Sequence, residues 1–401
     1  MSERQTSTRN RIPLVAWLGI GCAALFALIL AGCGGGGADN STSTPQGTAT
    51  YASGRIAGFG SIVVNGVHYD ETNAQIKDED GAGQSRSALK LGMTVAVRAG
   101  GLAQASNVTT AIAEDVTILS LARGPVESVA TDSLVVLGQT IKVTATTVFD
   151  DSLAGGLAAV KSGMVVQVFG LLDASTGTYT ATRIEPSDAD SYRLFGVVTA
   201  LNPTAKTMNI GNALIDVSAV SLPDGLKVGS LVRVKLMTTQ VNGAWVAISV
   251  SDGAEHPHDA DHAEVDGIVT SFTSTTAFSV DGLPVDASQA TFANGTSGLA
   301  QGAHVEVVGA VVNGVLVATV VKVETEQDME AQGLEVKGSI TSVDTVKSTF
   351  VVHGVTVSFA GSVNFDGGTA SDLKVGAQVE VKGSLASDGT TLNATEISFE
   401  D

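Results

Sequence analysis

The stretch that decides the fold is Phe350-Val351-Val352-His353-Gly354-Val355-Thr356-Val357-Ser358-Phe359. Residues that favour β-strands lie on both sides of the His-Gly pair. Glycine readily adopts the positive φ that a two-residue hairpin turn requires, so this stretch predicts two short antiparallel strands joined by a tight turn. The arrangement recurs earlier in the chain, with turns at Asn65-Gly66, Leu137-Gly138, Gly211-Asn212 and Asp281-Gly282.

Two series of glycines frame the hairpins and give the length of a repeat. Members of the first series precede the hairpins and are 70 to 72 residues apart: Gly54, Gly124, Gly196, Gly267 and Gly338. Members of the second series introduce a strand in which valine alternates with polar residues: Gly92, Gly163, Gly229, Gly302 and Gly376. Alternation with a period of two predicts a half-buried strand. The period exceeds that of solenoids, so each copy is expected to fold as a separate bead.

The pattern predicts an all-β chain of five tandem OB-like barrels, each a small five-stranded Greek key. A further turn after the valine strand leads into a final strand in every copy, and Tyr179 and Trp245 beside final strands are expected to be core or surface residues. The stretch between the third and fourth strands is not a hairpin. In the last copy it holds Ser371-Asp372-Leu373-Lys374, which is long enough for one helical turn. The third copy departs most from the pattern.

The N-terminal segment predicts export. Three arginines (Arg4, Arg9 and Arg11) precede an uncharged run from Leu14 to Ala31, which is the organisation of a signal peptide. Length alone would also permit an uncleaved membrane-spanning helix with an incidental cysteine. However, Leu30-Ala31-Gly32-Cys33 resembles the bacterial lipobox. This resemblance implies cleavage before Cys33 and acylation of its sulfur, and Gly34 in the next position implies sorting to the outer membrane.

These observations divide the chain into eight predicted segments. A cleaved lipoprotein signal peptide covers 1–32 and a Gly/Ser/Thr-rich linker covers 33–51. The first, second and third repeats are placed at 52–120, 121–189 and 190–252. An acidic His-rich linker follows at 253–263, and the fourth and fifth repeats cover 264–326 and 327–401.

The lipobox, the linker and the repeated unit together resemble a family of bacterial lipoproteins built from a tandem domain of unknown function. The resemblance implies an OB-like fold and an envelope location, and it carries over no catalytic residue. In the fifth repeat it rests on Gly338, Ile340, Val343, Val352, Gly354, Val357, Leu373, Gly376, Val379, Val381, Ala394 and Ile397.

The charge argues against nucleic acid and anionic lipid headgroups as partners. The chain has 22 basic and 41 acidic residues, and removal of the leader leaves a net charge near −21. Nucleic-acid binding depends on a basic face, which an acidic surface does not offer. The two cysteines, Cys22 and Cys33, both belong to the leader region, so the mature fold contains no intramolecular disulfide.

One cluster of possible metal ligands occurs, between Glu255 and Glu264. The candidate ligands for Zn, Ni or Cu are His256, His258, Asp261 and His262. The alternative is a solvated acidic linker in which Pro257 and the charges prevent packing. Weak, adventitious metal binding fits both interpretations. Asp78-Glu79-Asp80-Gly81 resembles a calcium loop only in part, and we interpret it as a loop insertion in the first repeat.

No sequence motif for nucleophilic, phosphate-loop or metalloprotease chemistry occurs, so we expect neither enzymatic activity nor a cofactor. The leading hypothesis is a non-catalytic, lipid-anchored envelope protein that presents tandem barrels as binding or spacer modules. OB barrels hold oligosaccharides as well as oligonucleotides, and acidity favours a glycan or a protein as the ligand. The alternative hypothesis is envelope divalent-metal binding or buffering through the His-rich linker.

Overall fold

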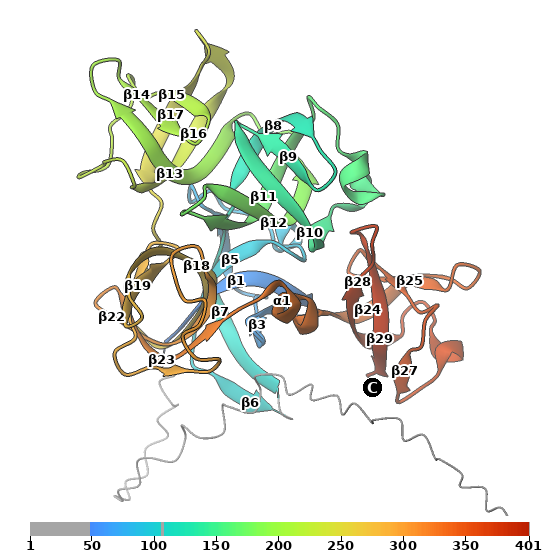
Figure 1. Cartoon of the computed structure of the whole chain (residues 1–401). Coiled ribbons are helices and arrows are strands. Elements are labelled where there is room, and N and C mark those ends of the chain that lie inside the picture. Colours follow the sequence, from blue (N-terminus) through green and yellow to red (C-terminus); the bar gives the residue numbers. More distant parts are fainter. Residues whose placement is uncertain (1–48, 106–107, 401) are drawn as a thin grey trace, which may run out of the picture. The chain divides into compact units, whose positions relative to one another are not determined.

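The computed structural model describes residues 49–105 and 108–400. The signal peptide, Cys33 and most of the linker 33–51 lie outside the described residues. Strands dominate the described part, as the sequence predicts, and they wrap into small barrels (Figure 1). Among the described residues, no helix has the length and apolar character needed to cross a membrane.

The fifth repeat shows the barrel most plainly. Its strands are β24 (Leu334–Asp344), β25 (Thr349–Val352), β26 (Val355–Ser358), β28 (Gln378–Leu385) and β29 (Thr391–Phe399). β24 pairs antiparallel with β25 and with β28, while β25 and β26 form the hairpin. β29 pairs with β26 in parallel and with β28 antiparallel, which closes the ring. This is the strand order of an OB barrel.

Four further sets of strands pair in the same cyclic order, which confirms tandem repeats. In the first repeat the ring is β1 (Thr50–Phe59), β2 (Ile62–Val64), β3 (Val67–Asp70), β7 (Val108–Ile118) and β5 (Thr94–Ala99). In the second it is β8 (Ala122–Val129), β9 (Ser133–Val136), β10 (Gln139–Phe149), β12 (Thr178–Pro186) and β11 (Val165–Asp173).

The third and fourth repeats close in the same way. In the third repeat the ring is β13 (Tyr192–Asn202), β14 (Thr207–Ile210), β15 (Ala213–Asp216), β17 (Ala244–Asp252) and β16 (Leu231–Val241). In the fourth it is β18 (Ala260–Ser274), β19 (Ala277–Val280), β20 (Leu283–Asp286), β23 (Val315–Val323) and β22 (His304–Val312). Shorter strands are β4 (Gln75–Asp78), β6 (Ala103–Ala105), β21 (Thr291–Phe292) and β27 (Asn364–Asp366).

The two series of glycines recur for different structural reasons. At Gly267, an added Cβ would lie 2.1 Å from Oδ2 of Asp281, the residue that begins the hairpin turn. The other members of the first series also lie under the hairpin, against Asn65, Leu137, Ile210 and His353. At Gly376, before the valine strand, φ is 92°, a conformation that L side chains rarely adopt. The other members of the second series also have positive φ.

Several side-chain and turn predictions are confirmed. Val379 and Val381 are fully buried in the barrel, and Tyr179 and Trp245 are buried core residues. The stretch before β28 forms a single 3₁₀ turn at Ala370–Asp372. The hairpin of the divergent third repeat turns at Gly211-Asn212, as its sequence indicates.

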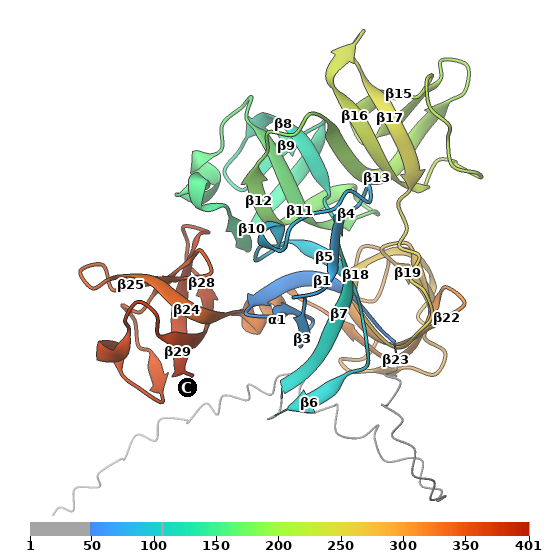
Figure 2. The same cartoon turned by 180° about the vertical axis from the view of Figure 1, so that it is seen from behind.

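Each repeat closes as its own ring, as expected, but the repeats also contact one another through β1. Residues Thr50 to Ser53 pair in parallel with His262 to Val265 of β18, and Gly58 and Phe59 pair with β24 (Figure 2). The reason lies in strand length, because β2 covers only the end of β1 and leaves the edge of its first half for β18. The buried core of the first repeat is continuous with that of the fifth.

Two predicted linker boundaries are wrong by a few residues. β18 begins at Ala260, inside the predicted linker 253–263, and Ala260 and Ala263 are buried. Pairing with β1 supplies the partner that makes this polar segment a strand. β1 itself begins at Thr50, inside the predicted linker 33–51. A short helix, α1 (Glu326–Gln332), which the sequence analysis missed, begins after the capping residue Thr325.

Candidate functional site

His256 and His258 are exposed and lie between the third and fourth repeats. Nε2 of His256 is 3.3 Å from Oδ2 of Asp252. Both imidazoles line an open depression of about 480 Å³ together with Tyr51 and Arg98 of the first repeat. The wall also contains acidic side chains, and one of them, Asp115, pairs with Arg98.

Asp261 and His262 belong to β18 rather than to a linker. His262 is largely buried, with Nε2 3.9 Å from Oε2 of Glu264, and burial lowers the pKa of its imidazole. Among residues 49–105 and 108–400, no three or more His, Cys, Asp or Glu side chains are arranged to hold a metal ion. The four predicted ligands are therefore not brought together.

The loop after β4 is the insertion that the sequence indicates, and it has a structural partner. Oδ1 of Asp78 accepts hydrogen bonds from the backbone amides of Asp80 (3.1 Å) and Ala82 (2.9 Å), which fixes the turn. Oδ2 of Asp78 accepts a 2.8 Å hydrogen bond from Nη2 of Arg193 in β13. The acidic loop of the first repeat thus contacts the third repeat.

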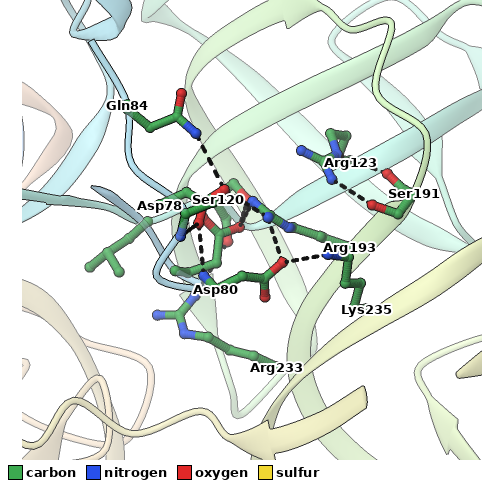
Figure 3. A network of polar contacts seen from close by, with 12 residues as sticks. Asp78, Asp80, Gln84, Ser120, Arg123, Ser191, Arg193, Arg233 and Lys235 are labelled. Atoms are coloured by element: carbon green, nitrogen blue, oxygen red, sulfur yellow. Dashed lines mark hydrogen bonds and ion pairs between the residues drawn. The ribbon is translucent and has the colours of Figure 1, made fainter. Parts of the chain in front are cut away.

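Arg193 is the centre of a polar network between these repeats (Figure 3). Its guanidinium also pairs with Glu79, at 3.1 Å from Nη1 to Oε1, and with Asp80. Lys235 of β16 approaches Asp80 to 3.3 Å. Burial disfavours the charged guanidinium, but Glu79 and its two neighbours outweigh that effect and raise the pKa of Arg193. We call this network of charged side chains, which joins the first and third repeats, the Arg193 clasp.

A cavity of about 520 Å³ lies where the first, second and fifth repeats meet. This volume is within the range of small-molecule sites. Its apolar wall includes Phe59, Leu89 and Leu334, and the exposed ring of His353 stacks on Phe59 with centroids 6.3 Å apart. We call this space the junction cavity.

The charged groups of the junction cavity are balanced in sign. Three are basic and three are acidic: Arg86, Lys90, Arg183, Glu71, Asp150 and Asp151. The buried Arg183 donates to Oδ2 of Asp150 at 3.1 Å and to the carbonyl of Leu91 at 3.3 Å, so it ties the second repeat to the first.

Two acidic side chains of the junction cavity differ in their environments. Burial works against the ionised form of Asp150, yet hydrogen bonds from Ser152 and the charge of Arg183 lower its pKa. Burial and the neighbouring Asp150 raise the pKa of Asp151. The cavity therefore offers charged hydrogen-bonding groups of both signs beside an aromatic surface, in a chain whose net charge is −19.

Sequence reasoning missed both the Arg193 clasp and the junction cavity. Asp78 and Arg193 are 115 residues apart, so no local pattern links them. The cavity is built from loop and strand ends of three repeats, so no local motif marks it. The acidic insertion was a partial signal for the Arg193 clasp, because the other repeats lack this insertion.

Comparison with known proteins supports the repeat interpretation. No curated protein matches the chain. Residues 123–185, 266–322 and 337–398 each match one family model, and these ranges fall within the predicted second, fourth and fifth repeats. The model describes a domain of unknown function, DUF5666, so the chain carries three matches to that domain in tandem.

Proposed function

We propose that the chain is a lipid-anchored protein of the bacterial envelope that binds a neutral glycan without catalysing a reaction. The observation that carries the ligand proposal is the junction cavity, with its aromatic surface and its three basic and three acidic groups. Sugars present an apolar face that packs on aromatic rings and hydroxyl groups that both donate and accept hydrogen bonds. An ionic ligand would gain little from a charge-balanced wall.

The anchor proposal rests on Leu30-Ala31-Gly32-Cys33 and on the glycine-rich linker that follows it. Several acyl chains on one cysteine give stable attachment to a bilayer, which a single chain does not. The flexible linker would hold the repeats away from the lipid surface. Gly34 favours the outer membrane as the location.

Acylation is tested by expressing the full chain in a Gram-negative host and separating membrane from soluble fractions. We expect the wild-type protein in the outer-membrane fraction, with an N-terminal peptide whose mass includes acyl chains on Cys33. The Cys33→Ser variant, which cannot be acylated, should leave that fraction. Cleavage without acyl mass, or membrane retention of Cys33→Ser after a salt wash, would contradict the proposed anchor.

Glycan binding is tested by calorimetry on the mature chain with several neutral outer-surface oligosaccharides. We expect saturable binding of at least one of them, weakened about tenfold or more in a Phe59→Ala, His353→Ala variant because the stacking surface is lost. The matched control is Phe292→Ala, His258→Ala, which removes the same residue types away from the junction cavity. Equal losses in both variants, or no saturable binding by the wild-type chain, would reject the proposed site.

A further inference from the structure

The outer face of the fourth repeat carries an unusual set of ionisable groups. Strand alternation directs Val265, Val305 and Val307 into the barrel interior. Their neighbours therefore lie on the opposite face: Glu264 and Asp266 of β18, His304 and Glu306 of β22, and Lys322 of β23 with Glu324 just after the end of that strand. This face is not solvated in the ordinary way, because Glu264 is only 3% exposed and Glu324 only 5%.

The contacts within this face are of two kinds. Nε2 of His304 pairs with Oδ1 of Asp266, and Nζ of Lys322 is 2.7 Å from Oε1 of Glu324. Asp266 and Glu324 therefore each have a basic partner. Glu264 and Glu306 instead lie on the same face of the paired strands β18 and β22, and they influence each other's ionisation. Two carboxyl groups in one site disfavour each other's charged form, because like charges repel.

The first repeat covers part of this face. Residues Thr50 to Ser53 of β1 pair with β18, and Nδ2 of Asn65 donates a 3.1 Å hydrogen bond to the carbonyl of Glu264. The other charged or titratable groups that face the acids from neighbouring elements are Arg55 of β1, Tyr69 of β3 and His262 of β18.

Asp281 adds a further acid at the edge of the same contact. It begins the β19–β20 turn, accepts a 3.2 Å hydrogen bond from the amide of Ile268, and lines a small cavity of about 40 Å³ with Ser53 and Gly54. The charges of Asp266, His304 and Glu255 act on it, and Arg233 of the third repeat lines the same cavity. Its counterpart in the first repeat is Asn65, which is the neutral isostere in the same positive-φ turn position.

We propose that the carboxyl groups of Glu306 and Asp281 make the contact between the fourth and first repeats sensitive to pH. The contact is closed in mildly acidic medium and loosens as the pH becomes alkaline. When both groups ionise, the acids on and beside this face outnumber Arg55, Lys322 and His304, and their repulsion acts across the β1–β18 pairing. This device is independent of the proposed glycan binding.

The direction of the effect follows from the two titrations. Burial, then Glu264, raises the pKa of Glu306 to about 8, and burial raises that of Asp281 to about 7. Both groups titrate near 4 once exposed, at about 4.3 for glutamate and about 3.9 for aspartate. Between about pH 4 and about pH 8, the closed contact therefore binds more protons than the open contact. Its stability is full below about pH 4 and falls as the pH rises through 7 and 8.

Hydrogen exchange of the whole mature chain, detected by mass spectrometry, tests the proposal. Protection factors, corrected for the intrinsic pH dependence of exchange, are compared at about pH 6 and about pH 9 for peptides from β1 and β18. In the wild-type chain we expect protection in both strands to fall at least about tenfold between the two conditions. In a Glu306→Gln, Asp281→Asn variant, these two side chains keep their shapes but cannot ionise, so the fall should become clearly smaller. Glu264, whose pKa burial raises to about 7, still titrates in this variant.

The matched control is Glu330→Gln, Asp190→Asn, which removes two exposed carboxylates and should retain the wild-type fall. If protection of β1 and β18 falls as much in the Glu306→Gln, Asp281→Asn variant as in the wild-type chain, the proposal is overturned. Constant protection in the wild-type chain would also overturn it, and this measurement remains decisive if the variant misfolds. Peptides from β11 and β12 of the second repeat report folding of each variant.

Discussion

Gly124 illustrates, at the scale of single residues, why the repeat keeps a glycine before each hairpin. An added Cβ would lie 2.6 Å from Cγ of Leu137, and Leu137 is fully buried at the hairpin turn. A buried branched side chain in a close-packed interior has no free space into which it can move. The glycine therefore recurs about every 71 residues because each hairpin imposes the same steric requirement.

This requirement predicts that Gly124→Ala destabilises the second repeat by about 1–3 kcal/mol through overpacking. Gly361→Ala is the control, because nothing lies within 4 Å of the position of its added Cβ. That control should change stability by no more than about 0.5 kcal/mol. Local opening free energies from hydrogen exchange in β8 and β9 measure the difference, and equal values for the two variants would refute the steric explanation.

The elements themselves could be predicted wherever their pattern is local. The hairpin over residues 350–359 and the valine strand after Gly376 follow from residue type and period alone, and both are present. The start of β18 could not be predicted, because His262 and Glu264 are polar and become buried only against β1, about 210 residues earlier. Local sequence does not reveal a partner strand from another repeat.

The candidate sites show the same limit. The histidines of residues 256–262 are close in sequence, but of these only His262 belongs to β18, and the described structure does not bring the predicted ligands together. Conversely, Asp78 and Arg193 show no local signal and yet form a buried ion pair. Sequence patterns predict residues that one element brings together, and they miss those that the packing of repeats brings together.

At the scale of the whole molecule, the repeats differ in what they contribute. The family model matches stretches of the second, fourth and fifth repeats. The first repeat adds β4 and its acidic loop, and the third supplies Arg193 and Lys235 to the Arg193 clasp. β1 pairs with two other repeats as well as within its own barrel. We infer that the first repeat connects the others, which is how the junction cavity and the pH-sensitive contact arise.

Hydrogen exchange of the loop at residues 78–84 in the mature Arg193→Ala variant tests this connection most directly. Loss of the guanidinium leaves Asp78, Glu79 and Asp80 without their shared partner in the third repeat. We expect protection of this loop, 109 to 115 residues before the substitution, to fall about tenfold or more. Lys227→Ala, an exposed lysine in the same repeat, should leave it unchanged. Wild-type protection of the loop in Arg193→Ala would contradict the claim that the first repeat holds the third.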